Sequence, residues 1–185
     1  MNSYKMNIAG LDRALPICPL NDKLSIGAFV IFGDPELTVA CARDLLKLAP
    51  EYDYLISAEA KGIPLIHEMA RQHGDATYML ARKAPKLYMT GVMEVKVRSI
   101  TTAAEQKLYI DTADAERMRG KRILIVDDVI STGGSLASLE NLVRQAGGEI
   151  VGKMTILAEG DAIGREDITY LEELPLFDGQ GNPIK

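Results

Sequence analysis

A run of ten residues, Val126–Ser135, combines residue types that suit a sugar phosphate. Two carboxylates, Asp127 and Asp128, follow the apolar run Ile123–Val126 and precede a turn rich in hydroxyls and glycines, after which leucines recur at helical spacing. Glycines let the backbone turn tightly and approach a ligand closely, and the free N–H groups at a helix start attract a phosphate. Adjacent carboxylates can hold vicinal hydroxyls or Mg²⁺, which prefers oxygen ligands. The segment therefore predicts a site for a sugar phosphate.

The plain alternative is an ordinary strand–turn–helix connection with acidic residues at the helix cap. A simple cap does not need the whole set of acids, hydroxyls and glycines, which comprises Asp127, Asp128, Ser131, Thr132, Gly133, Gly134 and Ser135. The segment has neither a Gly-Lys-Ser/Thr ending nor Gly-x-Gly-x-x-Gly spacing, so it indicates neither a nucleoside triphosphatase nor a dinucleotide-binding fold.

An apolar strand followed by two acids, two apolar residues and a Thr-Gly core resembles the phosphoribosyl-pyrophosphate (PRPP) signature of the type I phosphoribosyltransferases. The resemblance implies a displacement at ribose C1 with PRPP as donor and Mg²⁺ as cofactor. Asp127 and Asp128 would then hold the ribose hydroxyls and the metal, directly or through water. The 5′-phosphate would be bound by Ser131, Thr132, Gly133, Gly134 and Ser135.

Composition limits the other classes of function. The chain has 185 residues, enough for one domain with a sizeable core. Its formal net charge of −5 argues against a nucleic-acid partner. Neither a signal peptide nor an apolar run long enough to cross a bilayer is evident, so we expect no membrane contact and a cytoplasmic location. Cys18 and Cys41 stand in apolar settings and are expected to be buried thiols.

The spacing of apolar residues predicts alternating strands and helices, and hence an α/β fold with a mostly parallel sheet covered by helices on both faces. We expect helices over 34–48, 64–72 and 113–118, and another after the phosphate segment. Strands are expected over 24–32, 54–57, 77–81, 123–126 and 150–157, with a β-hairpin made by 96–101 and 107–110 and a long loop over 82–94. The resemblance adds a hood from about residues 1–30 and 158–185 to this single domain.

Two further segments gain meaning from the resemblance. Ser57–Pro64 is similar to the pyrophosphate loop of purine phosphoribosyltransferases, which implies pyrophosphate contacts and a cis non-proline peptide near Glu59-Ala60. A basic segment follows the strand that ends at Ala81, and in related dimers part of this segment reaches the partner's site. The predicted pyrophosphate-binding residues are Glu59, Ala60, Lys61, Gly62, Arg82, Lys83 and Lys86, with Lys61 and Arg82 also placed among the catalytic residues. A homodimer is the expected assembly.

The stretch Ser99–Gln106 resembles the flexible loop that closes over PRPP. Closure would exclude water from a ribose cation that water could capture. The acid that adenine enzymes commonly carry in this loop is replaced here by Thr101.

The base is harder to assign than the donor. Ser131 stands where hypoxanthine-guanine enzymes usually carry an aspartate, which favours the adenine and xanthine branches. Leu20 and Asn21 resemble a Leu-Asn pair of xanthine enzymes, whereas Glu159 replaces a lysine of oxopurine enzymes and, when ionised, can only accept a hydrogen bond. These three residues are the predicted purine contacts, and adenine is favoured over xanthine. A non-catalytic PRPP sensor is the alternative of another class.

Overall fold

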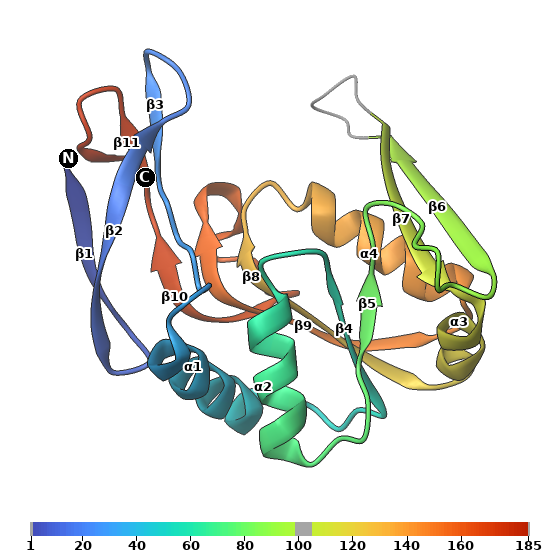
Figure 1. Cartoon of the computed structure of the whole chain (residues 1–185). Coiled ribbons are helices and arrows are strands. Elements are labelled where there is room, and N and C mark those ends of the chain that lie inside the picture. Colours follow the sequence, from blue (N-terminus) through green and yellow to red (C-terminus); the bar gives the residue numbers. More distant parts are fainter. Residues whose placement is uncertain (1, 99–104, 185) are drawn as a thin grey trace.

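The computed structural model describes residues 2–98 and 105–184, and its central element is a five-stranded parallel sheet (Figure 1). The register of every neighbouring pair is parallel, so all five strands carry their carboxyl ends to one edge. In spatial order the strands are β10 (Thr169–Leu174), β9 (Glu149–Glu159), β8 (Arg122–Ile130), β4 (Tyr54–Ala58) and β5 (Met79–Ala81).

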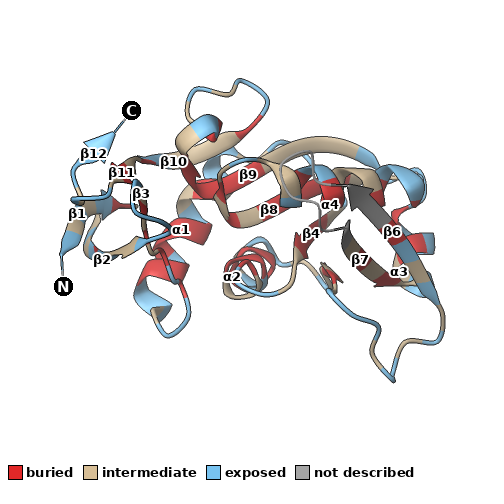
Figure 2. Cartoon of the chain, turned by 90° about the horizontal axis from the view of Figure 1, so that it is seen from above, coloured by how far each residue is buried: buried red, intermediate tan, exposed pale blue. Residues whose placement is uncertain are grey.

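Helices cover both faces of this sheet, as the sequence predicts. One face carries α1 (Pro35–Leu48) and α2 (Ile63–His73), and the other carries α3 (Thr112–Met118) and α4 (Gly134–Gln145). Side chains of β8 alternate between the two cores: Leu124 and Val126 pack toward α1 and α2, whereas Ile123 and Ile125 pack toward α3 and α4. Figure 2 shows buried segments on the central strands β8 and β9 and on the helices of both faces. The predicted α/β fold class is confirmed.

A second sheet of five strands forms a hood at one side of the central sheet (Figure 1). Its register is antiparallel throughout, and it joins the two ends of the chain. The strands in order are β1 (Ser3–Ile8), β2 (Leu11–Pro19), β3 (Leu24–Gly27), β11 (Leu176–Asp178) and β12 (Pro183–Ile184). At the opposite side, β6 (Val92–Arg98) and β7 (Glu105–Asp111) make the predicted hairpin, and a 3₁₀ turn η1 (Gly160–Ala162) follows β9.

Several predicted boundaries are wrong. The strand expected over 24–32 ends at Gly27, because pairing with β2 stops there while the alternation of buried and exposed side chains continues. The strand expected to stop before Asp127 runs to Ile130, because its ladder with β9 extends to the pair Ile130–Ala158. The hood strands β1 and β2 and the strands from β10 onward were not predicted. The alternation of polar and apolar residues in β1 was missed, whereas β10 lacks a regular alternation and β11 and β12 have only three and two residues.

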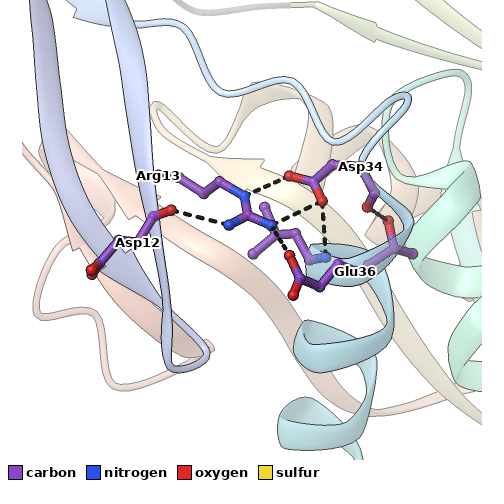
Figure 3. Close-up of polar contacts among 6 residues, drawn as sticks. Asp12, Arg13, Asp34 and Glu36 are labelled. Atoms are coloured by element: carbon purple, nitrogen blue, oxygen red, sulfur yellow. Dashed lines mark hydrogen bonds and ion pairs between the residues drawn. The ribbon is translucent and has the colours of Figure 1, made fainter.

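An ion cluster fixes the hood to the start of α1 (Figure 3). Arg13 on β2 donates from Nε to Asp34 at 2.6 Å and from Nη2 to Glu36 at 2.9 Å. Asp34 is also the N-cap of α1, since its Oδ1 accepts from the backbone N–H of Leu37 at 3.0 Å. The hydrogen bond from Arg13 holds the pKa of Asp34 below its usual value. The carboxylate of Asp34 therefore caps α1 and also links this helix to the hood.

Within the described ranges, no helix is both long and apolar enough to cross a membrane.

We predict that Asp34→Ala lowers the free energy of unfolding by about 1–2 kcal/mol, because a helix loses its capping acceptor. Asp34→Asn should cost less, since asparagine also caps helices well. Urea denaturation of both variants measures the difference. Because the pKa of Asp34 is lowered in the folded state, the advantage of wild type over Asp34→Asn should be complete above about pH 4 and disappear as the pH falls through that lowered pKa. Equal losses in both variants at neutral pH would show that charge, and not capping, is what matters.

Candidate active site

A cavity of about 760 Å³ lies at the carboxyl ends of the central strands. This volume is within the range of sites that hold small molecules, and ligands of open α/β sheets bind at this edge. The hood supplies one wall through residues 26–30, and β7 supplies Lys107 and Leu108. Of the predicted site residues, the cavity brings together Glu59, Ala60, Lys61, Lys83, Asp127, Asp128, Ser131, Ser135 and Glu159.

The predicted phosphate-binding turn forms a side hollow of about 50 Å³ next to the main cavity. It lies between the end of β8 and the first turn of α4, and Ser131 and Ser135 line both spaces. Gly133 has φ of +79°, a left-handed conformation that favours glycine, and it is the N-cap of α4. Thr132, Gly133 and Gly134 complete the hollow. All five residues predicted for the 5′-phosphate therefore surround one small space at a helix N-terminus.

The two carboxylates follow one another on β8, just before this turn. Asp128 is 3% exposed, and Nζ of Lys61 lies 3.2 Å from its Oδ2 in an ion pair. Oδ1 of Asp127 accepts a hydrogen bond from the backbone N–H of Asp128 at 2.9 Å. Burial, followed by the neighbouring charge of Asp128, raises the pKa of Asp127 to about 7. The pair thus carries unfavourable negative charge that a bound cation or a sugar's hydroxyls can offset.

The Glu59–Gly62 segment joins β4 to α2, and its Glu59–Ala60 peptide is cis, as the resemblance implies. Because Gly62 has no side chain, the Ser57 hydroxyl and the Asp127 carboxylate can lie close to it. A Cβ placed on Gly62 would lie 2.3 Å from Oγ of Ser57 and 3.2 Å from Oδ1 of Asp127. Within the described part of the chain, the Ser57 hydroxyl is fully buried and has no hydrogen-bond partner. Close packing at Gly62 therefore sets the distance between this segment and Asp127.

Glu59 gathers the predicted cations around itself. Its Oε2 accepts from the backbone N–H of Lys83 at 3.0 Å, and its Oε1 lies 3.4 Å from Nη2 of Arg82 and 3.7 Å from Nζ of Lys86. These contacts, led by the hydrogen bond from Lys83, keep the pKa of Glu59 below its usual value. Lys83 is among the described residues that line the main cavity. Arg82 and Lys86 pair with Glu59 and are not among them. Glu59 therefore holds these three basic residues close to one another.

The hood wall and Glu159 form the remaining side of the cavity. Glu159 ends β9 and is 8% exposed, and burial raises its pKa while the charge of Lys61 opposes the rise. The other two predicted base contacts lie elsewhere: Leu20 is exposed on the turn after β2, and Oδ1 of Asn21 accepts from the backbone N–H groups of Lys23 and Leu24. In the described structure neither lines the cavity. Their contact with a base stays a prediction.

Two parts of the wall were missed by the sequence analysis. Residues 28–30 were assigned to a strand, although Phe29 is buried and Val30 is 55% exposed beside the cavity. No sequence signal marked this stretch, because an apolar run is typical of a buried strand and the exposure of Val30 is visible only in the structure. Lys107 was placed only in a hairpin, and in the structure it lines the cavity and pairs with Glu94 at 3.4 Å. The predicted closing loop, Ser99–Gln106, falls largely on residues 99–104, which are outside the described residues.

Comparison with known proteins agrees with the fold. A profile described as "Phosphoribosyl transferase domain" matches residues 42–177. A hypoxanthine/guanine phosphoribosyltransferase of Methanotorris igneus is 34% identical over 69% of both chains, and one of a Methanocaldococcus species is 30% identical over 92% of this chain and 90% of its own. The solved adenine phosphoribosyltransferase of Rhodothermus marinus has a TM-score of 0.66 at 22% identity, with 94% of each chain covered.

The fold and these matches define a class first: an α/β protein with a phosphoribosyltransferase domain. The chain belongs to the type I phosphoribosyltransferase family, in its purine branch, and is an enzyme of that class.

We predict that Gly62→Ala disrupts the site more than it disrupts the fold. The new methyl group would collide with Ser57 Oγ, so the segment must move away from Asp127. Activity should fall by at least about 100-fold, since small displacements of positioned groups have effects of that size. Combining the change with Ser57→Ala removes the colliding hydroxyl and should restore part of the activity. A double variant no better than Gly62→Ala would contradict this account.

We predict that Asp127→Asn abolishes transfer but stabilises the protein without ligand. The folded state raises the pKa of Asp127 to about 7, so it retains a proton that the unfolded chain loses near pH 4. The free energy of unfolding of wild type should therefore fall as the pH rises through this window. Asp127→Asn should exceed wild type by about 1–3 kcal/mol at pH 8, with the gap closing toward pH 4. Urea denaturation across pH measures it, with the exposed Asp22→Asn as control.

Proposed function

We propose that the chain transfers the 5-phosphoribosyl group from PRPP to adenine, which gives AMP and pyrophosphate. The observation that carries this proposal is the joining of three surfaces in one cavity: the phosphate turn, the paired acids on β8 and the apolar hood wall. A phosphorylated sugar with a flat base attached needs these three surfaces in this order. The hypoxanthine/guanine and adenine enzymes that the chain resembles support the donor and the class of acceptor.

Each part of PRPP has a counterpart in the site. Backbone amides of residues 131–135 and the start of α4 suit the 5′-phosphate. Asp127 and Asp128 are near enough to hold the ribose hydroxyls, and their charge favours a cationic transition state at C1. Lys61 and Lys83 line the cavity on the side of the cis peptide, where they can stabilise the departing pyrophosphate. A ring nitrogen of the base then bonds to ribose C1 as the bond from C1 to pyrophosphate breaks, with no covalent enzyme intermediate.

The acids also fit Mg²⁺. Asp128 Oδ2 is buried without a hydrogen bond, although it pairs with Lys61, so an oxygen ligand is available. The described residues contain no group of three or more His, Cys, Asp or Glu that would hold a metal by themselves. Mg²⁺ is often held by one or two carboxylates together with phosphate oxygens and water, so Asp127 and Asp128 would hold it with PRPP. Bound there, it would neutralise charge on the leaving group.

The hood side of the cavity suits the base. Phe29, Val30 and Ile26 offer apolar surface, and Glu159 is the buried acid among them. An ionised carboxylate accepts hydrogen bonds and donates none, so it fits the exocyclic amine of adenine. This complementarity is our reason for proposing adenine.

A second acceptor class is favoured by a specific observation. The curated relatives at 30–34% identity are named hypoxanthine/guanine phosphoribosyltransferases. Burial raises the pKa of Glu159, and a protonated carboxyl can donate to a purine carbonyl. Hypoxanthine and guanine are therefore the alternative acceptors. The homodimer and the cytoplasmic location stay predictions, although the exposed apolar pair Leu87 and Tyr88 beside the basic segment is compatible with a covered surface.

The acceptor is tested by supplying adenine, hypoxanthine, guanine and xanthine in turn with PRPP and Mg²⁺ and measuring nucleotide and pyrophosphate. We expect adenine to react fastest. Glu159→Gln should lower kcat/KM for adenine about tenfold and raise it for hypoxanthine, since the amide can donate as well as accept. The exposed Asp161→Asn, two residues along, should change neither. Faster reaction with hypoxanthine and guanine would establish the second candidate, and xanthine alone would contradict the role of Glu159. No product with any purine would overturn the proposed function.

A further inference from the structure

The phosphate turn has no cation of its own. Between Arg122 and Arg144 the sequence contains neither lysine nor arginine, while Asp127 and Asp128 lie within it. A 5′-phosphate in the turn would therefore meet backbone amides beside two acids. Backbone amides and a helix dipole supply only partial positive charges. A full positive charge nearby would therefore strengthen the binding of the phosphate.

Arg165 brings such a charge to the turn from a distant part of the sequence. It lies after η1, in the connection from β9 to β10. A Cβ placed on Gly133 would lie 2.8 Å from Nη1 of Arg165, so the guanidinium rests directly against the glycine. The φ of +79° favours glycine at position 133, and a side chain there would also displace this guanidinium. Arg165 is not among the described residues that line the hollow, so it would act on a bound anion through the turn.

The guanidinium is held in this position by a chain of ion pairs. Asp167 accepts from Nε at 2.9 Å and from Nη2 at 2.8 Å, which leaves Nη1 as the edge that faces Gly133. Nζ of Lys153 on β9 pairs with Asp167 at 2.5 Å and with Glu140 on α4 at 2.8 Å.

This chain of ion pairs returns to the helix that the turn begins. Glu140 also pairs with Arg144 one turn further along α4, at 3.2 Å. The chain contains three cations and two carboxylates, so one positive charge is left over. Arg165 is at the end nearest the turn.

We propose that Arg165 is a positioning residue for the ribose 5′-phosphate, which fixes Gly133 in place and supplies the positive charge that the turn lacks. The identity of the anion rests on the proposed function. Because Arg165 acts through the turn, its effect is confined to one end of PRPP: the 5′-phosphate gains from it, and the pyrophosphate near Lys61 and Lys83 does not. This asymmetry separates the proposal from a general contribution to folding.

The test compares two fragments of the donor, ribose 5-phosphate and inorganic pyrophosphate with Mg²⁺, by calorimetric titration of the full chain. Arg165→Gln should bind ribose 5-phosphate about tenfold more weakly and pyrophosphate within twofold of wild type. Arg165→Lys keeps the charge without the fork to Asp167, and should recover part of the loss. Arg144→Gln is the matched control, because it removes a cation from the far end of the same ion-pair chain and should leave both affinities within twofold. Steady-state kinetics should show a higher KM for PRPP with kcat and the KM for the base unchanged.

Thermal unfolding of each variant separates folding from binding. A selective loss of ribose 5-phosphate in variants that melt within a few degrees of wild type supports the role. Equal weakening of both ligands in Arg165→Gln and Arg165→Lys, or no weakening of either, overturns it. Failure of the wild type to bind either ligand would instead overturn the proposed function, and this inference with it.

Discussion

Two carboxylates that follow one another on a buried strand are the constraint on which the ligand-binding end of the molecule depends. Asp127 and Asp128 belong to β8, the middle strand of the central sheet, and the neighbouring ladder continues past them. Burying like charges together is unfavourable unless counter-charges are supplied. Lys61 provides one of these from the loop before α2. In the proposed function, the negative charge that Lys61 leaves uncompensated would favour hydroxyl donors, a metal and the positive charge that develops at a sugar carbon.

The cations proposed to attract the ligand's anions come from different elements and are paired with different acids. Lys61 stands against Asp128, Arg82 and Lys86 stand against Glu59, and Arg165 stands against Asp167. Each cation is thus fixed before a ligand arrives, and little reorganisation is needed when charge moves during the reaction. Pre-set electrostatics of this kind is commonly the largest contribution to catalysis. Pairing with an acid also weakens each cation's attraction for an anion. Binding of the anions would therefore depend on several cations acting together.

Sequence analysis identified the parts of this protein that chemistry constrains most tightly. The turn after β8 depends on particular residue types, so its geometry was predictable residue by residue, whereas the cis peptide at Glu59–Ala60 was expected only from the family resemblance. The hood was anticipated in outline only, because β11 and β12 are very short and the pairing of the hood strands is set by contacts between the two ends of the chain. The position of Arg165 was not foreseeable, since a cation thirty-two residues from Gly133 gives no local signal. The contacts that place Asn21 on its own turn were equally hidden.

The hood draws its strands from both ends of the polypeptide, with β3 pairing directly to β11. A nascent chain is made from its N-terminus, and β11 follows β10, the last strand of the central sheet, after a single residue, so both sheets receive their final strands at the end of synthesis. Until then β3 has an open hydrogen-bonding edge, and Phe177, which is fully buried in the finished protein, has yet to fill its place. The hood is therefore closed only when the last tenth of the chain has been made, and its first three strands must wait for a partner from the other end.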